Sequence, residues 1–460
     1  MLRPVALLVA AVFTIPSLAP AQTPDTLRDS TVRRLEALER EVETLRREFQ
    51  DLASMGGGGA ARQGRQAPDQ RYGQPSGIAS RPFLYRGGGA AVGGYVDLEF
   101  ARELDAGQTH FTQHRLIPFI FAEIADRLHF GTEIEFEYGG PNSPTRDGEL
   151  KVEFAAFDLN LAPALNLRAG ALLAPLGKFN LIHDSPVNDL TDRPLVDSRI
   201  VPTTLTEAGA GLWGQLFPSE GSVLTYEAYV VNGFNNALLS YAVNAGTGAI
   251  TPVTNVRSAR ASMRRDNNEG KSFLGRLAFS PALGLEIGAS AHTGAYSDEG
   301  DGRLTVAALD AIVARGRWEL LGEFGRASLT IDGANERTRA LAAYRAARDD
   351  DSTGFGAAYA AVRHVTAQQG GYVQLNYHFG QGALSFTNST FTAVVRLDHL
   401  DLDANTDGDL QQRASAGFNW RPIEQTAIKV DYQWNWLTPR GATTAAPPTQ
   451  RIVASVATYF

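Results

Sequence analysis

The chain has 460 residues, a formal net charge of −8 and no cysteine. The lack of cysteine excludes disulfides, thiolate metal sites, a cysteine nucleophile and a lipid attached to an N-terminal cysteine. The mild negative charge offers no basic footprint for nucleic acid. Mean hydropathy is −0.18, and no interior stretch approaches the roughly 20 apolar residues of a spanning helix, which argues against an α-helical inner-membrane protein.

Residues 1–21 have the pattern of an export signal. Arg3 supplies the basic start, Val5 to Ile15 form a short apolar stretch, and Ala19-Pro20-Ala21 fits a small-residue cleavage site. The apolar stretch is too short for a membrane anchor, the alternative interpretation. We therefore expect export and a mature chain that begins near Gln22.

Residues 25–55 follow a heptad pattern, with apolar residues at the a and d positions of a coiled coil. With a set at Leu35, Arg34 faces Glu39 of a parallel neighbour and Glu41 faces Arg46, so both pairs are opposite in charge. This pattern predicts self-association without deciding dimer from trimer, and a single amphipathic helix packed on its own domain is the alternative. The seam residues are Leu35, Leu38, Val42, Leu45, Phe49 and Leu52.

Residues 56–88 are dominated by glycine, glutamine, arginine and proline, a composition typical of a flexible linker. A short coil on such a tether has no core of its own to pack against. From residue 89 to residue 460 the pattern changes to strict alternation of apolar and polar residues, which is the period of a β-strand. Between 427 and 437, for example, Ile428, Val430 and Tyr432 fall on one face, and Lys429 and Asp431 on the other.

The connections between these strands alternate in length. Every second one is tight, such as Ala125-Asp126 or Ala162-Pro163-Ala164, whereas 175–205, 234–270 and 331–367 each exceed twenty residues. Short turns at one rim and long loops at the other are typical of transmembrane β-barrels, with the turns in the periplasm. We predict an antiparallel barrel of about 16 strands. The strands are expected at 90–101, 110–124, 127–138, 150–161, 165–174, 206–217, 222–233, 271–280, 284–295, 304–314, 317–330, 368–380, 387–401, 410–420, 425–438 and 450–460.

Two of these segments, 110–124 and 150–161, are apolar on both faces, which indicates either a subunit interface or a slipped strand frame. The last strand alternates up to Phe460 and resembles the assembly signal of outer-membrane proteins, although the aromatic Tyr459 comes one place later than usual.

A more particular pattern spans Leu172 to Leu216. It contains the segment Leu173-Ala174-Pro175-Leu176-Gly177-Lys178-Phe179-Asn180, then His183-Asp184-Ser185-Pro186, and the strand Glu207-Ala208-Gly209-Ala210-Gly211-Leu212-Trp213-Gly214. Over about fifty residues this resembles the phosphate-selective porin O and P family. The resemblance implies a trimeric sixteen-stranded barrel whose long loop after the fifth strand folds inward and narrows the pore; here that loop is 175–205.

The loop carries both signs of charge, and the acids at least match the bases, so we expect a mixed-charge constriction rather than a basic phosphate trap. Most of these side chains are expected to attach the loop to the wall, and one or two to face the pore. The loop charges are Lys178, Asp184, Asp189, Asp192, Arg193, Asp197 and Arg199; the expected basic residues of the pore wall are Arg168, Arg276, Arg396, Arg413 and Lys429, opposed by Asp398, Asp431, Glu319 and Glu323.

Two other motifs are weak. The Gly209, Gly211 and Gly214 spacing of a dinucleotide site lies within a strand with no helix after it. A partial calcium loop at 403–409 lacks the glutamate at its twelfth position, where Ala414 stands, so a solvated acidic loop competes with a cation site. The loop's candidate ligands are Asp403, Asn405, Asp407 and Asp409.

The function predicted from these patterns is an outer-membrane porin, a passive channel for small hydrophilic or charged solutes, with no enzymatic activity, no cofactor and no nucleic-acid partner. Its expected partners are outer-membrane lipid, the solutes, two further copies in a homotrimer and, through a periplasmic coiled coil, peptidoglycan. The alternatives are a phospholipase-like barrel enzyme and a structural tether between the outer membrane and the cell wall. No Gly-x-Ser-x-Gly motif is present to favour the enzyme.

Overall fold

The computed structural model describes residues 85–87, 90–141, 148–219, 221–260, 263, 266–384 and 389–460. All of them belong to one compact unit, residues 63–460. The predicted export signal, the coiled coil and nearly all of the linker lie outside the described residues.

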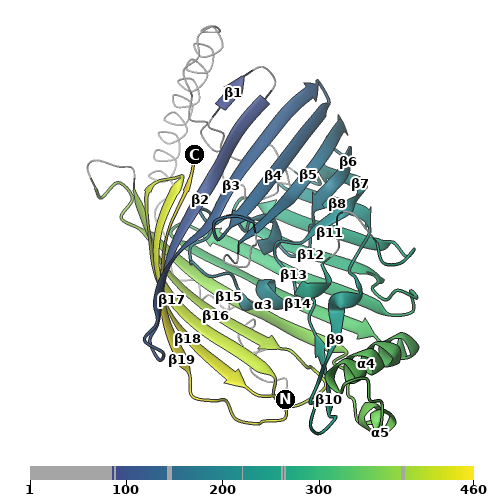
Figure 1. The fold of residues 1–460 in the computed structure, drawn as a ribbon. Coiled ribbons are helices and arrows are strands. Elements are labelled where there is room, and N and C mark those ends of the chain that lie inside the picture. Colours follow the sequence, from purple (N-terminus) through teal and green to yellow (C-terminus); the bar gives the residue numbers. More distant parts are fainter. Residues whose placement is uncertain are drawn as a thin grey trace, which may run out of the picture. The chain divides into compact units, whose positions relative to one another are not determined.

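Within the described chain, sixteen antiparallel strands form a closed barrel, because β8 pairs with β11 across a long loop and β19 pairs with β2 (Figure 1). The predicted barrel is therefore confirmed, strand by strand. The strands are β2 (Ala90–Glu103), β3 (Thr109–Ala125), β4 (Leu128–Glu137), β5 (Glu149–Ala162), β6 (Leu165–Leu173), β7 (Thr206–Leu216), β8 (Val223–Val231), β11 (Ser272–Ala282), β12 (Leu285–Ala295), β13 (Arg303–Arg315), β14 (Trp318–Thr330), β15 (Ala367–Phe379), β16 (Thr390–Asp401), β17 (Leu410–Ile423), β18 (Thr426–Thr438) and β19 (Thr449–Tyr459).

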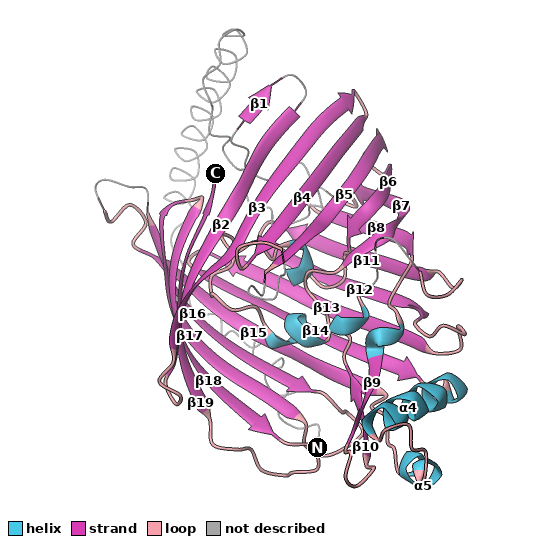
Figure 2. Ribbon diagram, viewed as in Figure 1, coloured by secondary structure: helices cyan, strands magenta, loops and turns pink. Residues whose placement is uncertain are grey.

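Several short strands and helices lie in addition to the sixteen barrel strands (Figure 2). A three-residue strand, β1 (Tyr85–Gly87), pairs with the start of β2. The hairpin of β9 (Leu239–Val243) and β10 (Ile250–Thr254) packs against α4 (Gly333–Ala347) and α5 (Phe355–Ala360). The β9–β10 hairpin has no counterpart among the strands expected from the sequence. No described helix has the length and apolar character needed to cross a membrane.

The rims of the barrel differ as the connection lengths predicted. The turn rim carries tight turns such as Gly316-Arg317, together with the start of β2 and the end of β19. The loop rim carries the long connections 174–205, 232–271 and 331–366, including α4 and α5, which lie at the opposite end of the barrel from the end of β19 (Figure 1).

The two faces of each strand differ in polarity. Outward side chains such as Leu98, Phe273 and Leu309 are 51%, 52% and 60% exposed, while inward neighbours such as Asp97 and Asp310 are buried. An apolar outer face is what a hydrocarbon environment requires. At the turn rim, aromatic rings gather on adjacent strands, as in the aromatic belts of membrane barrels. Each of these rings contacts at least one other in the group; they are Trp318, Tyr377, Phe379, Phe391, Phe418 and Trp420.

The segments that are apolar on both faces have a structural explanation. The strand frame did not slip, since β3 and β5 occupy the predicted positions. Their inward apolar residues, including Ile117, Phe119 and Phe154, form a buried cluster inside the barrel with Tyr95. Val187, from the connection between β6 and β7, packs against this cluster. A subunit interface on their outer face stays a prediction.

The seam between β19 and β2 closes around one glycine. Phe460 and Gly94 exchange two backbone hydrogen bonds, of 2.9 and 3.2 Å. A Cβ atom at position 94 would lie 2.5 Å from Cζ of Phe460 and 2.6 Å from the carbonyl oxygen of Ile117, which is far inside van der Waals contact. The seam therefore requires glycine at this position.

We predict that Gly94→Val destabilises the closed barrel by about 1–3 kcal/mol, because overpacking displaces the Phe460 ring or the β3 backbone. The loss is measured as a lower temperature at which the folded band disappears in semi-native electrophoresis. Gly356→Ala, at a helical position with open space around it, is the control and leaves that temperature unchanged. Equal temperatures for Gly94→Val and wild type would contradict the account of the seam.

Candidate functional site

The loop 174–205, between β6 and β7, folds into the barrel and bonds to the inner wall on several sides. Its neck is held by Asn180, whose side-chain amide donates to the carbonyl of Ala174 at 2.7 Å and accepts from the backbone N–H of Leu205 at 3.0 Å. The loop contains one turn of 3₁₀ helix, η2 (Phe179–Leu181), and one short helix, α3 (Leu195–Arg199). We call it the inner loop.

The Gly-Lys-Phe segment of the inner loop is fixed to β12 and β14. The backbone N–H groups of Lys178 and Phe179 both donate to one carboxylate oxygen of Glu323, at 2.8 and 3.1 Å. The Lys178 ammonium group pairs with Glu286 at 2.8 Å. Gly177 has φ +72°, and a Cβ there would lie 2.0 Å from the Glu323 carboxylate. The motif is therefore a wall anchor, and its glycine is needed for both conformation and space.

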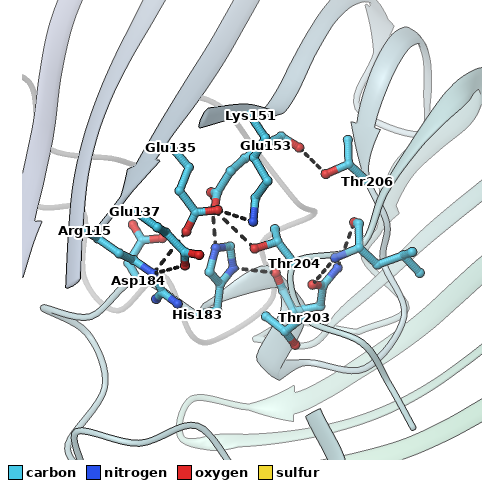
Figure 3. Close-up of polar contacts among 12 residues, drawn as sticks. Arg115, Glu135, Glu137, Lys151, Glu153, His183, Asp184, Thr203, Thr204 and Thr206 are labelled. Carbon is cyan, nitrogen blue, oxygen red and sulfur yellow. Dashed lines mark hydrogen bonds and ion pairs between the residues drawn. The ribbon is translucent and has the colours of Figure 1, made fainter. Parts of the chain in front are cut away.

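A second anchor lies on an acidic stretch of β4 and β5 (Figure 3). Glu153 approaches Nε2 of the buried His183 at 3.3 Å and accepts from the Thr204 hydroxyl at 3.2 Å. Beside it, Arg115 of β3 pairs with Glu135 at 3.0 Å and with Glu137 at 3.2 Å. His183 thus serves to hold the loop, and its Nδ1 contacts the carbonyl of Asn180 at 2.8 Å.

Residues of β15, β17 and β18 hold the middle of the inner loop, with bases in place of the acids of β4 and β5. Asp189 pairs with Arg421 of β17 at 3.2 Å and accepts from the amides of Asn376 and Asn419 at 2.7 and 2.9 Å. Lys429 of β18 donates to the carbonyl of Ser185 at 3.0 Å.

Asp192 extends this contact, since it meets Arg451 of β19 at 2.9 Å and Arg413 of β17 at 3.4 Å. Arg396 of β16 donates to the carbonyl oxygens of Asp192 and Arg193. The basic wall therefore binds both the acids and the backbone of the inner loop.

The remaining loop charges divide into buried and exposed groups. Asp184 accepts from the Tyr459 hydroxyl at 2.7 Å, and Asp197 is fully buried. Arg193 donates to the carbonyl of Thr203 at 2.9 Å and lies within electrostatic reach of the acidic stretch. Arg199 alone has an exposed side chain among residues 174–205, all of which the structure describes. Because the loop lies inside the barrel, Arg199 faces the lumen.

The other two predicted wall cations are also paired. Arg168 bonds Asp158 at 2.7 Å and Glu227 at 3.4 Å, and Arg276 bonds Asp310 at 2.6 Å. All five predicted wall bases therefore point inward and meet acids or loop carbonyls.

The candidate calcium loop lies at the loop rim. Asp403 is buried and forms an ion pair with Arg440, while the amide of Asn405 donates to Thr366. Asp409 has a positive φ of 56°. Among the described residues, the cluster with metal-ligating geometry lies elsewhere, at Asp97, Glu99 and His114, which sequence reasoning missed.

Comparisons with known proteins give distant matches. The anion-selective porin of Comamonas acidovorans is 11% identical, with TM-score 0.48 over 81% of this chain and 99% of that one. The outer-membrane channel DcaP of Acinetobacter baumannii is 12% identical, with TM-score 0.47 over 81% and 98%. OmpT of Vibrio cholerae is 8% identical, with TM-score 0.46 over 82% and 99%.

One curated relative, an uncharacterized protein of Aquifex aeolicus, is 31% identical over 216 residues, which is 47% of this chain and 46% of that protein. The match thus spans about half of the relative's length. A scan of protein families finds no match.

We predict that Asp189→Ala frees the middle of the inner loop. The change removes the carboxylate that pairs with Arg421 and accepts from two amides, at a cost of about 1–3 kcal/mol for the lost buried acceptor. Limited proteolysis of the folded barrel in detergent, followed by mass spectrometry, should show new cleavage within 174–205. Asp350→Ala, which removes an acid that is 89% exposed, is the control and should leave the digestion pattern unchanged. A protected loop in Asp189→Ala would refute the anchoring role.

Proposed function

We propose that this protein is an outer-membrane porin, a passive diffusion channel for small hydrophilic or charged solutes. The observation that carries the proposal is the inner loop, bonded to the wall from β5 round to β19 inside a closed barrel with an apolar outer face. A loop held in this way narrows the lumen without depending on a bound ligand.

The constriction carries both signs of charge, which sets up a transverse field and selects by size and charge. Its partly or fully exposed loop charges are Asp192, Arg193 and Arg199. Lys178, the base of the motif that resembles phosphate-selective porins, is buried and paired with Glu286. These contacts favour a mixed-charge constriction over a phosphate trap.

The proposed assembly is a homotrimer in the outer membrane, with the coiled coil in the periplasm. Support comes from the turn rim, where β1 pairs with the start of β2, since short turns face the periplasm in such barrels. The heptad pattern and the apolar outer residues of β3 and β5, such as Ile120 and Phe157, supply self-associating surfaces.

Planar-bilayer recording of the folded protein tests this function. Stepwise conductance increases are expected, in groups of three for a trimer. Folded protein that inserts and carries no current would exclude a channel and leave the tether or the enzyme. If the constriction is not a phosphate trap, adding phosphate should reduce the current no more than adding chloride at the same concentration of negative charge.

Arg199→Glu is expected to shift the reversal potential in a potassium chloride gradient toward cation preference, because the variant reverses the one exposed charge on the inner loop. The unit conductance should change less than twofold. Arg345→Glu on α4, where the side chain is 49% exposed outside the barrel wall, is the matched charge reversal and should leave the potential in place. Identical potentials in all three proteins would remove Arg199 from the constriction.

A further inference from the structure

Three side chains on the inner face of β2 and β3 converge near the inner loop. Nδ1 of His114 lies 2.6 Å from Oε1 of Glu99 and 3.3 Å from Oδ2 of Asp97. The three ligand-type atoms all lie within 4.8 Å of one another. We propose that this cluster is a binding site for a divalent transition-metal ion, with zinc as its simplest occupant.

A β-bulge creates the cluster. Asp97 pairs with Arg115 across the strands, but Leu98 pairs with Gln113, so His114 is the extra residue on β3. In regular pairing, neighbouring residues of a strand point to opposite faces. The bulge breaks this alternation and lets His114 turn inward beside Arg115, toward the acids of β2. Bulges recur where a strand must redirect a side chain.

The distances between the ligand atoms of His114, Asp97 and Glu99 are close to those around a bound metal ion. Ligands about 2.1 Å from a metal stand about 3.0–3.4 Å apart in octahedral or tetrahedral geometry. The 3.3 Å separation of His114 and Asp97 already meets this distance, and the Glu99 contact needs to open by less than an ångström. One imidazole with two carboxylates is a donor set that zinc and its neighbours accept.

A separate observation points to a missing ligand. Asp97 is 1% exposed, and its Oδ1 atom is buried without a hydrogen-bond partner among the described residues. A buried carboxylate oxygen in this state is costly unless a proton donor or a cation reaches it. A metal ion bound by both carboxylate oxygens of Asp97, beside Nδ1 of His114, would supply that cation.

The surroundings leave room for an ion to enter. The side chains of His114 and Glu99 are 16% and 14% exposed, so the cluster opens toward the lumen. The His114 ring stacks on Tyr138, with centroids 5.7 Å apart, which fixes the imidazole plane. Two cations lie close and weaken the attraction for a metal, but each has its own acceptors: Arg115 bonds Glu135 and Glu137, and Lys429 bonds the carbonyls of Ser185 and Leu190.

Isothermal titration with zinc tests the site, using the full-length barrel folded in detergent and stripped with a chelator. Wild type should bind one zinc ion per chain, and His114→Ala and Glu99→Gln should each weaken binding at least tenfold. His110→Ala removes an exposed imidazole from the same strand and should keep the wild-type affinity. Because binding is read without current, a barrel that binds zinc but does not conduct would fail the channel proposal and keep this one.

Folding is checked by a second measurement. Zinc should raise the temperature of thermal unfolding of wild type and of His110→Ala, and should leave that of Glu99→Gln unchanged. Equal zinc binding by wild type and all three variants, or no binding by any of them, would overturn the proposed metal site. The cluster would then be a hydrogen-bonded imidazole with two carboxylates. Should His114→Ala fail to fold, the isosteric Glu99→Gln and Asp97→Asn variants decide the question by titration alone.

Discussion

An irregular loop inside a barrel has to satisfy its backbone polar groups without help from the strands, whose own N–H and C=O groups are used in the sheet. In this protein the side chains of the inner wall meet that need. Glu323 accepts from two successive loop N–H groups, and Asp431 accepts from that of Thr191. Lys429 and Arg421 donate to loop carbonyl oxygens. In an open lumen these charged wall residues would be available to solute. Here they hold the inner loop in place instead.

Because these wall charges hold the loop, the number of charged residues in the barrel does not indicate how many can act on a solute. Counted by residue type, the wall and the inner loop hold many bases and many acids, and by that count alone both signs are available to act on ions. Counted by contact, Lys178, Arg413 and Arg168 have acidic partners within 3.4 Å. A paired and buried charge contributes little field beyond its partner, so the field in the lumen depends on the few exposed charges. Arg199 is the clearest of these on the loop.

The sequence predicted the strands well and the contacts poorly, for one reason. Strand positions depend on local alternation and turn residues, and all sixteen follow from them. Contacts depend on register across the barrel: Asp189 and Arg421 are 232 positions apart, and no local pattern joins them. The metal-type cluster illustrates the limit, since Asp97 and Glu99 share a face by period two, but His114 joins them only through a bulge that leaves no mark in composition.

The arrangement of charge around the barrel also explains why the inner loop has one orientation. Strands β4 and β5 present Glu135, Glu137 and Glu153 near the inner loop, while β17 and β19 present Arg413, Arg421 and Arg451. The loop turns Asp189 and Asp192 toward the basic side and His183 toward the acidic side. A loop folded the other way would bring acids against acids in a region shielded from water, where like charges repel most strongly. The acidic and basic parts of the wall therefore act together to fix the orientation of the inner loop.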